Sequence, residues 1–194
     1  MFFPYRLRKL LSLCRRIGNR RGYGIHSPFA FSFVTGVIYE RGEFYAYEEL
    51  REMRNDGQRR ALREKDERLL LRIANFQRPK CGILLGNPDD TTRWALATGC
   101  KECRWGDDAG GSAYADMLYA ASGSWEDKIS RLVETVPPKA LIILHKPYAD
   151  AASAEAWRQV CRLPRVTLSF DLFDFGLLFV EERFAKTHYP IFYV

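Results

Sequence analysis

The chain has 194 residues, of which 47% are hydrophobic and 14% aromatic, and it carries a formal net charge of +6. This composition is typical of a globular chain with one sizeable core. No apolar run approaches the ~20 residues that a membrane-spanning helix needs. Arg6, Arg8 and Lys9 interrupt the apolar region that a secretory signal requires. The five cysteines follow no framework spacing, so we expect reduced thiols and a cytoplasmic protein.

The first 39 residues hold seven basic side chains and no acidic one. Apolar residues recur there at helical spacing and predict a basic amphipathic helix: Leu7, Leu10, Leu11, Cys14 and Ile17. We expect the apolar face to pack on the body of the protein or on a second subunit, with the arginines in water. The alternative is contact with an anionic membrane surface or with nucleic acid through residues 6–21.

Residues 81–97 combine a buried strand, a tight turn and the start of a helix. The apolar run is Ile83-Leu84-Leu85, and the turn is Gly86-Asn87-Pro88. The N-cap candidates that follow are Asp89, Asp90, Thr91 and Thr92. In open α/β sheets such a turn faces the ligand crevice, and a helix N-terminus attracts anions. This stretch therefore predicts a nucleotide-type site.

The rest of the chain alternates between predicted helices and strands. Helices are predicted at 48–54, about 58–75, 125–136 and 153–162, the last with Ser153 as its N-cap. Strands are predicted at 102–105, 116–120 and 140–145, then as an antiparallel pair at 166–170 and 177–181, before an extended tail at 188–194. This order predicts an α/β fold with a mostly parallel sheet and a C-terminal antiparallel hairpin. We expect a helical extension at 1–78 and an α/β domain at 79–194.

Three local strings carry a family resemblance. They are Gly24-Ile25-His26-Ser27-Pro28-Phe29-Ala30-Phe31, the helix entry Tyr45-Ala46-Tyr47-Glu48, and Asp171-Leu172-Phe173 followed by Gly176-Leu177. With the order of elements, they make the chain resemble class I S-adenosylmethionine (SAM)-dependent methyltransferases. More narrowly, it resembles a bacterial O-methyltransferase-like branch with an N-terminal helical extension. The resemblance implies a Rossmann-like methyltransferase fold.

The resemblance also implies where a cofactor would bind. In that family the first strand ends in an acidic residue, and a glycine-rich turn then approaches the cofactor. Here Leu84 occupies the acidic position, and Gly86 with Asn87 keeps only the start of the turn. By the same resemblance, Asp107 or Asp108 would bind the ribose hydroxyls.

The later strands of the family end in carboxylates that this chain lacks. The fourth strand leads to an Asp-Gly element and the fifth ends in paired carboxylates, but the matches here are residues 120–123 and Leu144-His145. His145 is then the candidate catalytic base. Only residues 106–115 separate the second strand from the next one. A crossover helix, a third strand and a return helix need about 30 residues, so we expect a shortened crossover and a lost third strand.

These losses favour a degenerate methyltransferase-like protein, a pseudoenzyme that binds SAM weakly or not at all. One alternative is an active SAM-dependent methyltransferase with an unknown small-molecule acceptor. Another is a module that binds nucleic acid or an anionic membrane through the basic N-terminus. Independently of the function, the N-terminal helices offer a surface for a homodimer. No metal site is predicted, because Cys100 and Cys103 lack a second ligand pair. Asp171 and Asp174 are interpreted as turn-forming residues.

Overall fold

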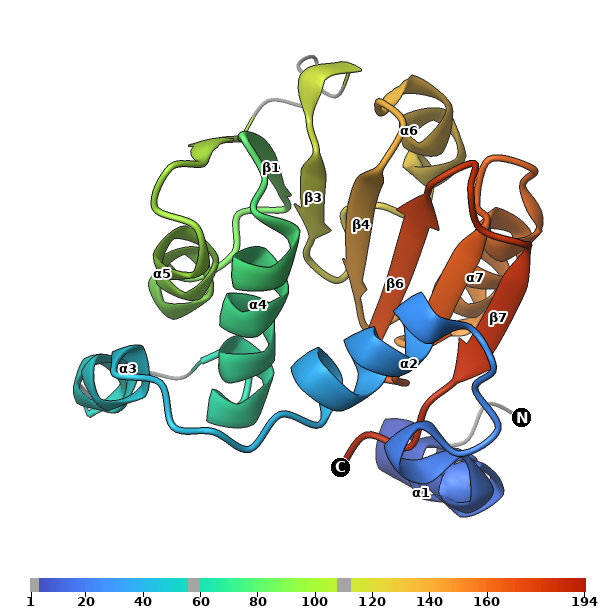
Figure 1. Ribbon diagram of the computed structural model, residues 1–194, viewed down its shortest axis with the longest axis horizontal. Coiled ribbons are helices and arrows are strands. Elements are labelled where there is room, and N and C mark those ends of the chain that lie inside the picture. Colours follow the sequence, from blue (N-terminus) through green and yellow to red (C-terminus); the bar gives the residue numbers. More distant parts are fainter. Residues whose placement is uncertain (1–3, 56–59, 108–112) are drawn as a thin grey trace. The chain divides into compact units, whose positions relative to one another are not determined.

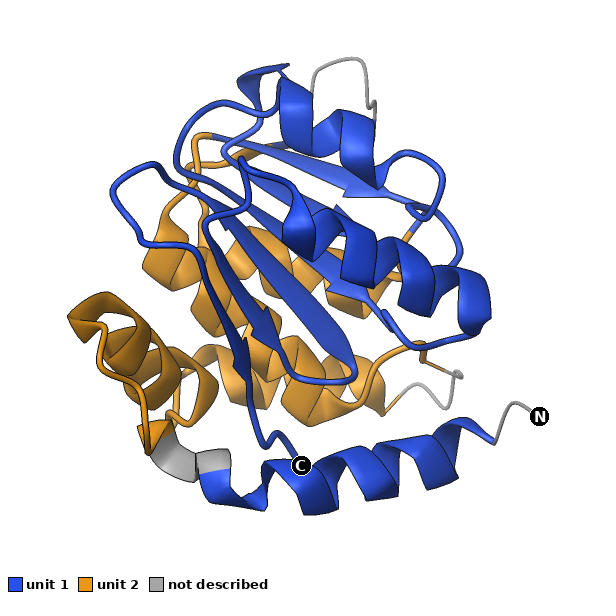
Figure 2. Ribbon diagram, turned by 90° about the vertical axis from the view of Figure 1, so that its right-hand side faces the viewer, with its two compact units in different colours: residues 1–20, 81–87, 105–194 blue, residues 21–80, 88–104 orange. Residues whose placement is uncertain are grey.

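The computed structural model describes residues 4–55, 60–107 and 113–194 (Figure 1). The chain divides into two compact units (Figure 2). Unit 1 comprises residues 1–20, 81–87 and 105–194, and unit 2 comprises residues 21–80 and 88–104. Each unit has its own packing and is described by itself.

Unit 1 contains most of a seven-stranded sheet in the order β2-β1-β3-β4-β6-β5-β7. The strands are β1 (Cys81–Leu85), β2 (Arg104–Gly106), β3 (Met117–Ala120), β4 (Ala140–His145), β5 (Leu168–Asp171), β6 (Phe175–Val180) and β7 (Thr187–Pro190). β1, β3 and β4 are mutually parallel, β6 runs antiparallel to both β4 and β5, and β7 is parallel to β5. The mostly parallel sheet with a C-terminal antiparallel hairpin is therefore confirmed.

Four inner strands of unit 1, β3, β4, β5 and β6, are buried along their whole length, which favours their apolar, strand-forming residues. All six residues of β4 are buried, as the continuous apolar run from Ala140 to Leu144 predicts for a central parallel strand. Register places Leu118 beside Ile142, and Ile142 beside Leu178, so that same-face side chains form one continuous apolar layer.

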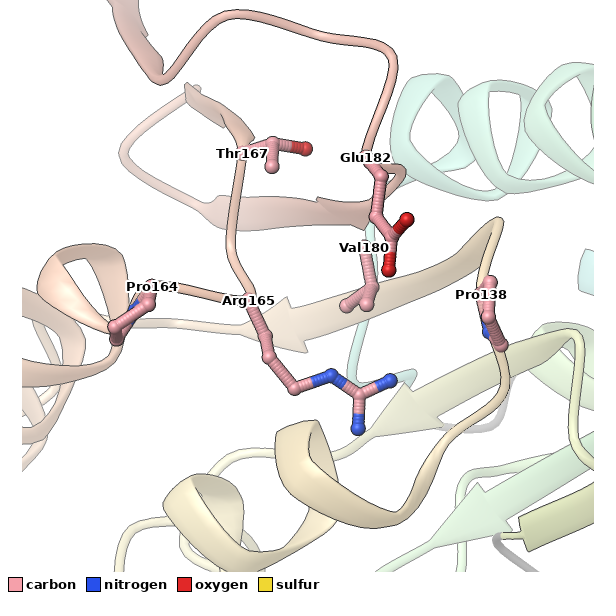
Figure 3. A pocket seen from close by; sticks show the side chains of 6 residues that line it. All are labelled: Pro138, Pro164, Arg165, Thr167, Val180 and Glu182. Atoms are coloured by element: carbon pink, nitrogen blue, oxygen red, sulfur yellow. The ribbon is translucent and has the colours of Figure 1, made fainter.

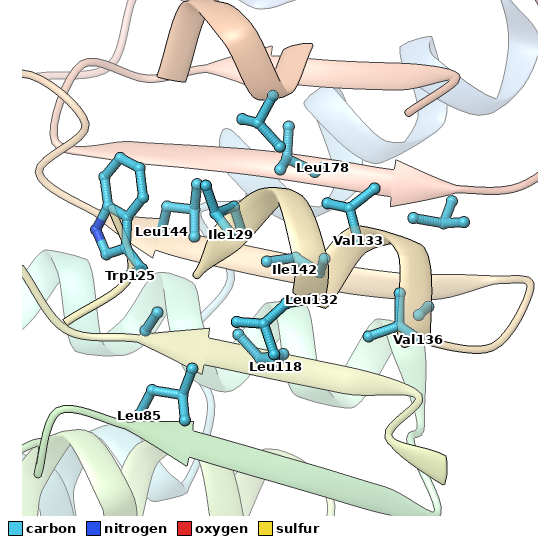
Figure 4. Packing of buried hydrophobic residues seen from close by; sticks show 14 of the residues in the cluster. Leu85, Leu118, Trp125, Ile129, Leu132, Val133, Val136, Ile142, Leu144 and Leu178 are labelled. Atoms are coloured by element: carbon cyan, nitrogen blue, oxygen red, sulfur yellow. The ribbon is translucent and has the colours of Figure 1, made fainter. Parts of the chain in front are cut away.

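Two helices cover that layer, α6 (Ile129–Thr135) and α7 (Ala151–Arg162). Figure 4 shows α6 lying over the strands, with its apolar side chains Ile129, Leu132 and Val133, and Val136 directly after it, in the layer. Trp125 and Trp157 are the largest fully buried side chains of the protein's described part, and both belong to this layer. The ring of Trp157 approaches Gly176 so closely that a Cβ there would lie 2.4 Å from the ring. A glycine at this strand position is thus required by packing.

The start of α7 corrects one prediction. The side chain of Asp150, not Ser153, caps the helix, and its Oδ1 accepts from the Ser153 backbone N–H at 2.8 Å. The N-cap site lies at the carboxylate because Asp150 has extended backbone angles, whereas Ser153 is already helical. Ser153 is instead fully buried.

Unit 2 is helical. Its elements are α2 (Pro28–Phe33), the π-helix η2 (Val34–Ile38), α3 (Ala46–Arg54), α4 (Glu64–Gln77) and α5 (Asp90–Gly99), and the 3-10 helix η1 (Ile17–Gly22) leads into it from α1 (Tyr5–Arg16). Ser27 caps α2 with Pro28 in the first turn, and Asp89, one of the four N-cap candidates of the sequence, caps α5. α4 begins at Glu64, later than the predicted 58, and residues 56–59 lie outside the described residues.

Unit 2 is held by apolar packing and by the hydrogen bonds of buried charged groups, among them Arg72 and Glu67. The Arg72 guanidinium donates to the Val37 carbonyl at 2.7 Å and to the Tyr47 hydroxyl at 2.9 Å. Glu67 is fully buried and accepts from Thr91 and Arg54. Burial raises the pKa of Glu67, and the hydrogen bonds and the positive charge of Arg54 oppose that rise.

Candidate functional site

The turns that follow β1 and β3 meet at the topological switch point of the sheet. The chain leaves β1 for β2 on one side and returns to β3 on the other side. In open α/β sheets, ligands bind in the crevice outside the carboxyl ends of such a strand pair. Gly86 and Asn87, two of the predicted cofactor residues, form the turn after β1 with φ values of 78° and 49°.

This glycine turn packs directly against the turn after β3. A Cβ on Gly86 would lie 2.5 Å from Cβ of Ser124 and 3.1 Å from Cβ of Ala121. The two turns are also joined through the backbone, because the Ala121 N–H donates to the Leu85 carbonyl at 2.9 Å. The side of Gly86 that a Cβ would occupy is therefore filled by the protein's own chain.

The turn after β3 is stabilised by a glutamate that sequence reasoning missed. Glu126 accepts from the backbone N–H groups of Gly123 at 3.2 Å and of Trp125 at 3.1 Å. It also accepts from the Ser153 hydroxyl at 2.9 Å. With three donors, this carboxylate acts as an internal brace for the turn. A glutamate two residues after the Ser124 turn was the available sequence signal.

The predicted ribose ligands lie after the edge strand. Asp107 follows β2, the sheet neighbour of β1, and is exposed. Asp108 lies outside the described residues. Among the described residues, no strand lies between β2 and β3 in the chain, which agrees with the predicted loss of one crossover. Whether either aspartate binds a ribose remains a prediction.

His145, the predicted base, ends β4 and is 5% exposed. Its ring stacks on Phe175, its partner across the β4–β6 ladder, with the ring centroids 5.5 Å apart. Its backbone carbonyl accepts from the Trp125 indole N–H at 3.3 Å. The catalytic assignment of His145 remains a prediction, on a side chain that is almost wholly enclosed.

A charged cluster occupies the same edge of unit 1, where the β5–β6 hairpin turns beside the carboxyl end of β4. The Arg16 guanidinium of α1 donates two parallel hydrogen bonds to the Asp171 carboxylate, at 3.0 Å to Oδ1 and 2.7 Å to Oδ2. It also donates to the Asp171 backbone carbonyl at 2.7 Å. Both side chains are more than nine-tenths buried. This is the bidentate geometry in which an arginine–carboxylate pair is strongest.

The Asp171 carboxylate has two further donors. The Phe173 backbone N–H donates to Oδ1 at 2.9 Å, and the Tyr148 hydroxyl donates to Oδ2. Burial and the nearby carboxylate raise the pKa of Tyr148, which keeps its phenol protonated as the donor. Phe173 has a left-handed backbone with φ of 69°, and its ring stacks on Tyr148 at 4.9 Å.

Asp174, at the other end of the turn, receives a second pair of contacts from α1. The Lys9 ammonium forms an ion pair with Oδ2, and the Tyr5 hydroxyl donates to Oδ1 at 2.8 Å. Arg8 donates to the Ala149 carbonyl at 3.1 Å. The basic helix therefore binds its own unit through its polar side chains, and the two turn aspartates are its receptors.

This arrangement overturns the expectation that the apolar face of the N-terminal helix packs on the body of the protein, whereas packing of that face on a second subunit stays a prediction. The apolar residues do not pack on the body, since Leu7, Leu10, Leu11 and Ile17 are between 40% and 58% exposed. Arg16 is not in water either, because it is only 8% exposed. The bidentate pair and the Lys9 contact fix the opposite face. Lys9 and Arg16, seven residues apart on one helix face, together with the two turn aspartates, were the sequence signal for it.

A pocket lies at the opposite end of the strands, beside the amino ends of β4 and β5 and the carboxyl end of β6 (Figure 3). It has a volume of about 210 Å³ and is lined by Pro138, Pro164, Arg165, Thr167, Val180 and Glu182. The Arg165 guanidinium donates to the carbonyls of Glu134 and Val136, the latter at 2.9 Å. The one cationic group of the lining is thus committed to the protein's own backbone, and the pocket offers no evident anion site.

In the described part of the chain, no group of three or more His, Cys, Asp or Glu side chains could hold a metal ion. The cysteines of this part, Cys100 and Cys103 included, carry free thiols. Over the same residues, no helix is both long enough and apolar enough to cross a membrane.

Comparison with known proteins identifies the fold. No protein-family model matches the chain, and no curated protein matches it. Among solved structures, the SAH-bound methyltransferase PaMTH1 of Podospora anserina has a TM-score of 0.50 and 11% identity, and the match covers 80% of this chain and 96% of that one. A methyltransferase from Geobacter sulfurreducens gives 0.49 and 16% over the same shares. The O-methyltransferase from Bacillus cereus, in complex with SAH, gives 0.46 and 12% over 77% and 96%.

The likeness to PaMTH1, with the strand order, shows that this chain has the Rossmann-like fold of class I SAM-dependent methyltransferases, as the sequence predicted. At 11% identity the likeness concerns the fold alone.

Proposed function

We propose that this chain is a degenerate methyltransferase-like protein whose switch-point crevice binds SAM weakly or not at all. The observation that carries the proposal is the contact of Gly86 with Ser124. In a cofactor-binding turn, the missing Cβ gives the ligand room to approach the backbone. Here that room is taken by the turn after β3.

The side chains at the strand ends also fit the cofactor poorly. β1 ends in Leu84 and Leu85, and β3 ends in Ala120 followed by Ala121. These apolar groups cannot accept hydrogen bonds from the hydroxyl or ammonium groups of SAM. Any buried polar ligand atom left without a partner would cost about 1–3 kcal/mol, so each missing acceptor weakens binding.

Three carboxylates near this edge already have partners within unit 1. Asp171 and Asp174 are paired with the cations of α1, and Glu126 accepts three hydrogen bonds from its own turn. Recruiting any of them to a ligand would mean breaking these contacts. These carboxylates therefore stabilise the protein's own turns and helix α1 and are not preorganised to bind a ligand.

An active methyltransferase with a rebuilt pocket is the second candidate. The observation that favours it is the pair of left-handed residues Gly86 and Asn87, which keep a turn of the required type after β1. In this reading Asp107 or Asp108 would hold the ribose and His145 would be the base. The enclosure of His145 against Phe175 counts against it, because a base must reach the proton that it abstracts.

Calorimetric titration with SAM and with SAH tests the proposal on the full chain. We expect either no heat or a titration that does not approach saturation at millimolar ligand, with at most a small rise in the melting temperature. A micromolar dissociation constant, equivalent to about −8 kcal/mol, would overturn it. A His145→Gln variant, checked for native circular dichroism, would then be assayed against acceptor candidates, and retained turnover would exclude His145 as the base.

A further inference from the structure

The N-terminal helix α1 exposes its most apolar face. Leu10 and Leu11 are 58% and 47% exposed, and Leu7 is 40% exposed. These three residues and the exposed Cys14 lie along one side of the helix, since successive residues are about 100° apart. We call this set the leucine stripe. Leaving such a stripe in water is unfavourable, so its position needs an explanation.

The stripe is held in this position by the opposite face of the same helix. Arg16 and Lys9 are paired with the Asp171 and Asp174 carboxylates, and Tyr5 adds a hydrogen bond at 2.8 Å. These contacts occur at both ends of the helix, so α1 cannot roll to bury its leucines without breaking them. The leucine stripe is therefore presented by a fixed helix rather than by a loose one.

Arginines border the leucine stripe on both sides. At about 100° per residue, Arg6 lies next to Leu10 on one border, and Arg15 lies next to Leu11 on the other. Both arginines are exposed. An apolar centre with cationic borders is the pattern of helices that lie in the plane of a membrane surface, where the leucines enter the acyl boundary and the arginines reach the phosphates.

We propose that α1 docks the protein on an anionic lipid surface through the leucine stripe and its two bordering arginines. Nucleic acid fits this face less well, because the centre of the face is apolar and the cations lie at its edges. A second copy also fits less well. An isologous pairing of two stripes would bring arginines close to arginines, and the first 39 residues contain no acidic side chain to relieve the repulsion.

Co-sedimentation of the full chain with lipid vesicles tests the proposal. We expect binding to vesicles of phosphatidylcholine with a quarter phosphatidylglycerol, weaker binding in high salt, and little binding to pure phosphatidylcholine. Arg6→Gln and Arg15→Gln should each weaken binding about fivefold. Leu10→Glu should abolish it. Tyr114→Glu is the matched control, because Tyr114 is also an exposed large side chain of unit 1, at 78%, and lies before the amino end of β3.

Cys14 supplies a second readout that reports which face is covered. Its exposed thiol should react quickly with a water-soluble maleimide, and anionic vesicles should slow that reaction at least tenfold. The variants' native circular dichroism confirms that loss of binding is not loss of fold. Failure of the full chain to bind anionic vesicles at low salt, or binding that Leu10→Glu leaves unchanged, would overturn the proposal. So would a dimer in solution that Leu10→Glu dissociates, because the stripe would then be an interface between copies.

Discussion

The Arg16–Asp171 pair allows the anchoring of α1 to be tested quantitatively. Replacing Arg16 with Met keeps the length and apolar contact of the stem but removes three hydrogen bonds, at 2.7, 3.0 and 2.7 Å. Breaking a buried ion pair from one side costs about 3–5 kcal/mol, because the remaining charge stays buried. Asp171 retains donors from Tyr148 and from the Phe173 backbone. We therefore expect the lower end, about 3 kcal/mol of unfolding free energy.

Urea denaturation followed by circular dichroism measures this loss, with Arg15→Met as the matched control. Arg15 is the exposed neighbour in the same last helical turn, and its replacement should change the free energy of unfolding by less than about 0.5 kcal/mol. Hydrogen exchange of the α1 amides separates local detachment of the helix from global unfolding. In Arg16→Met those amides should exchange much faster.

A double-mutant cycle completes the test. Asp171→Asn alone should also destabilise the chain, and its combination with Arg16→Met should cost less than the sum of the two single changes. A coupling of about 2 kcal/mol is expected for directly contacting charged groups. If Arg16→Met is no more destabilising than Arg15→Met, or if the two changes are additive, the pair does not hold α1 and the reasoning fails.

Two further predictions concern unit 1. Gly86→Ala should destabilise the protein more than Gly123→Ala. Both glycines have left-handed backbones, with φ of 78° and 81°, and a side chain in that conformation costs about 1–2 kcal/mol. Of the two, only Gly86 would place the new Cβ against another atom, 2.5 Å away on Ser124. Equal losses in chemical denaturation, or no partial rescue by Ser124→Gly, would contradict the close packing of the two turns. Burial lowers the pKa of His188 below its usual 6.5, so the unfolded chain takes up the proton more readily than the folded one. The stability that neutral His188 contributes is therefore present above pH 6.5 and is lost as the pH falls through the lowered pKa. His188→Asn should therefore flatten the loss of stability on acidification, and parallel slopes of unfolding free energy for wild type and His188→Asn between pH 7 and 5 would refute this.

Local patterns predicted the elements of unit 1 well. The continuous apolar run gave β4 its observed bounds, Ala140–His145, and the alternation of elements gave the mixed sheet. The N-cap of α7 was wrong because two good capping residues, Asp150 and Ser153, stand three positions apart. Local propensity does not distinguish them, since the choice depends on the backbone angle of each.

Contacts between residues far apart in the chain account for what could not be predicted. Hydrophobic periodicity identified the apolar face of α1, but burial of that face was an assumption. The true contacts join Arg16 to Asp171 and Lys9 to Asp174 across most of the chain. The turn at Gly86 was predicted, whereas its closure on Ser124 depends on strand register, which a single sequence does not specify.

The open seven-stranded sheet has an edge strand on each side, and both edge strands have features that disfavour pairing with a strand of another chain. One edge strand, β2, has three residues, and the other, β7, has four and ends in Pro190. Short strands and proline make poor templates for the addition of a foreign strand. β7 also shields β5, whose four residues are all buried and whose Phe170 stacks on Tyr189. We therefore expect removal of residues 187–194 to expose β5 as an unprotected edge strand and to promote aggregation.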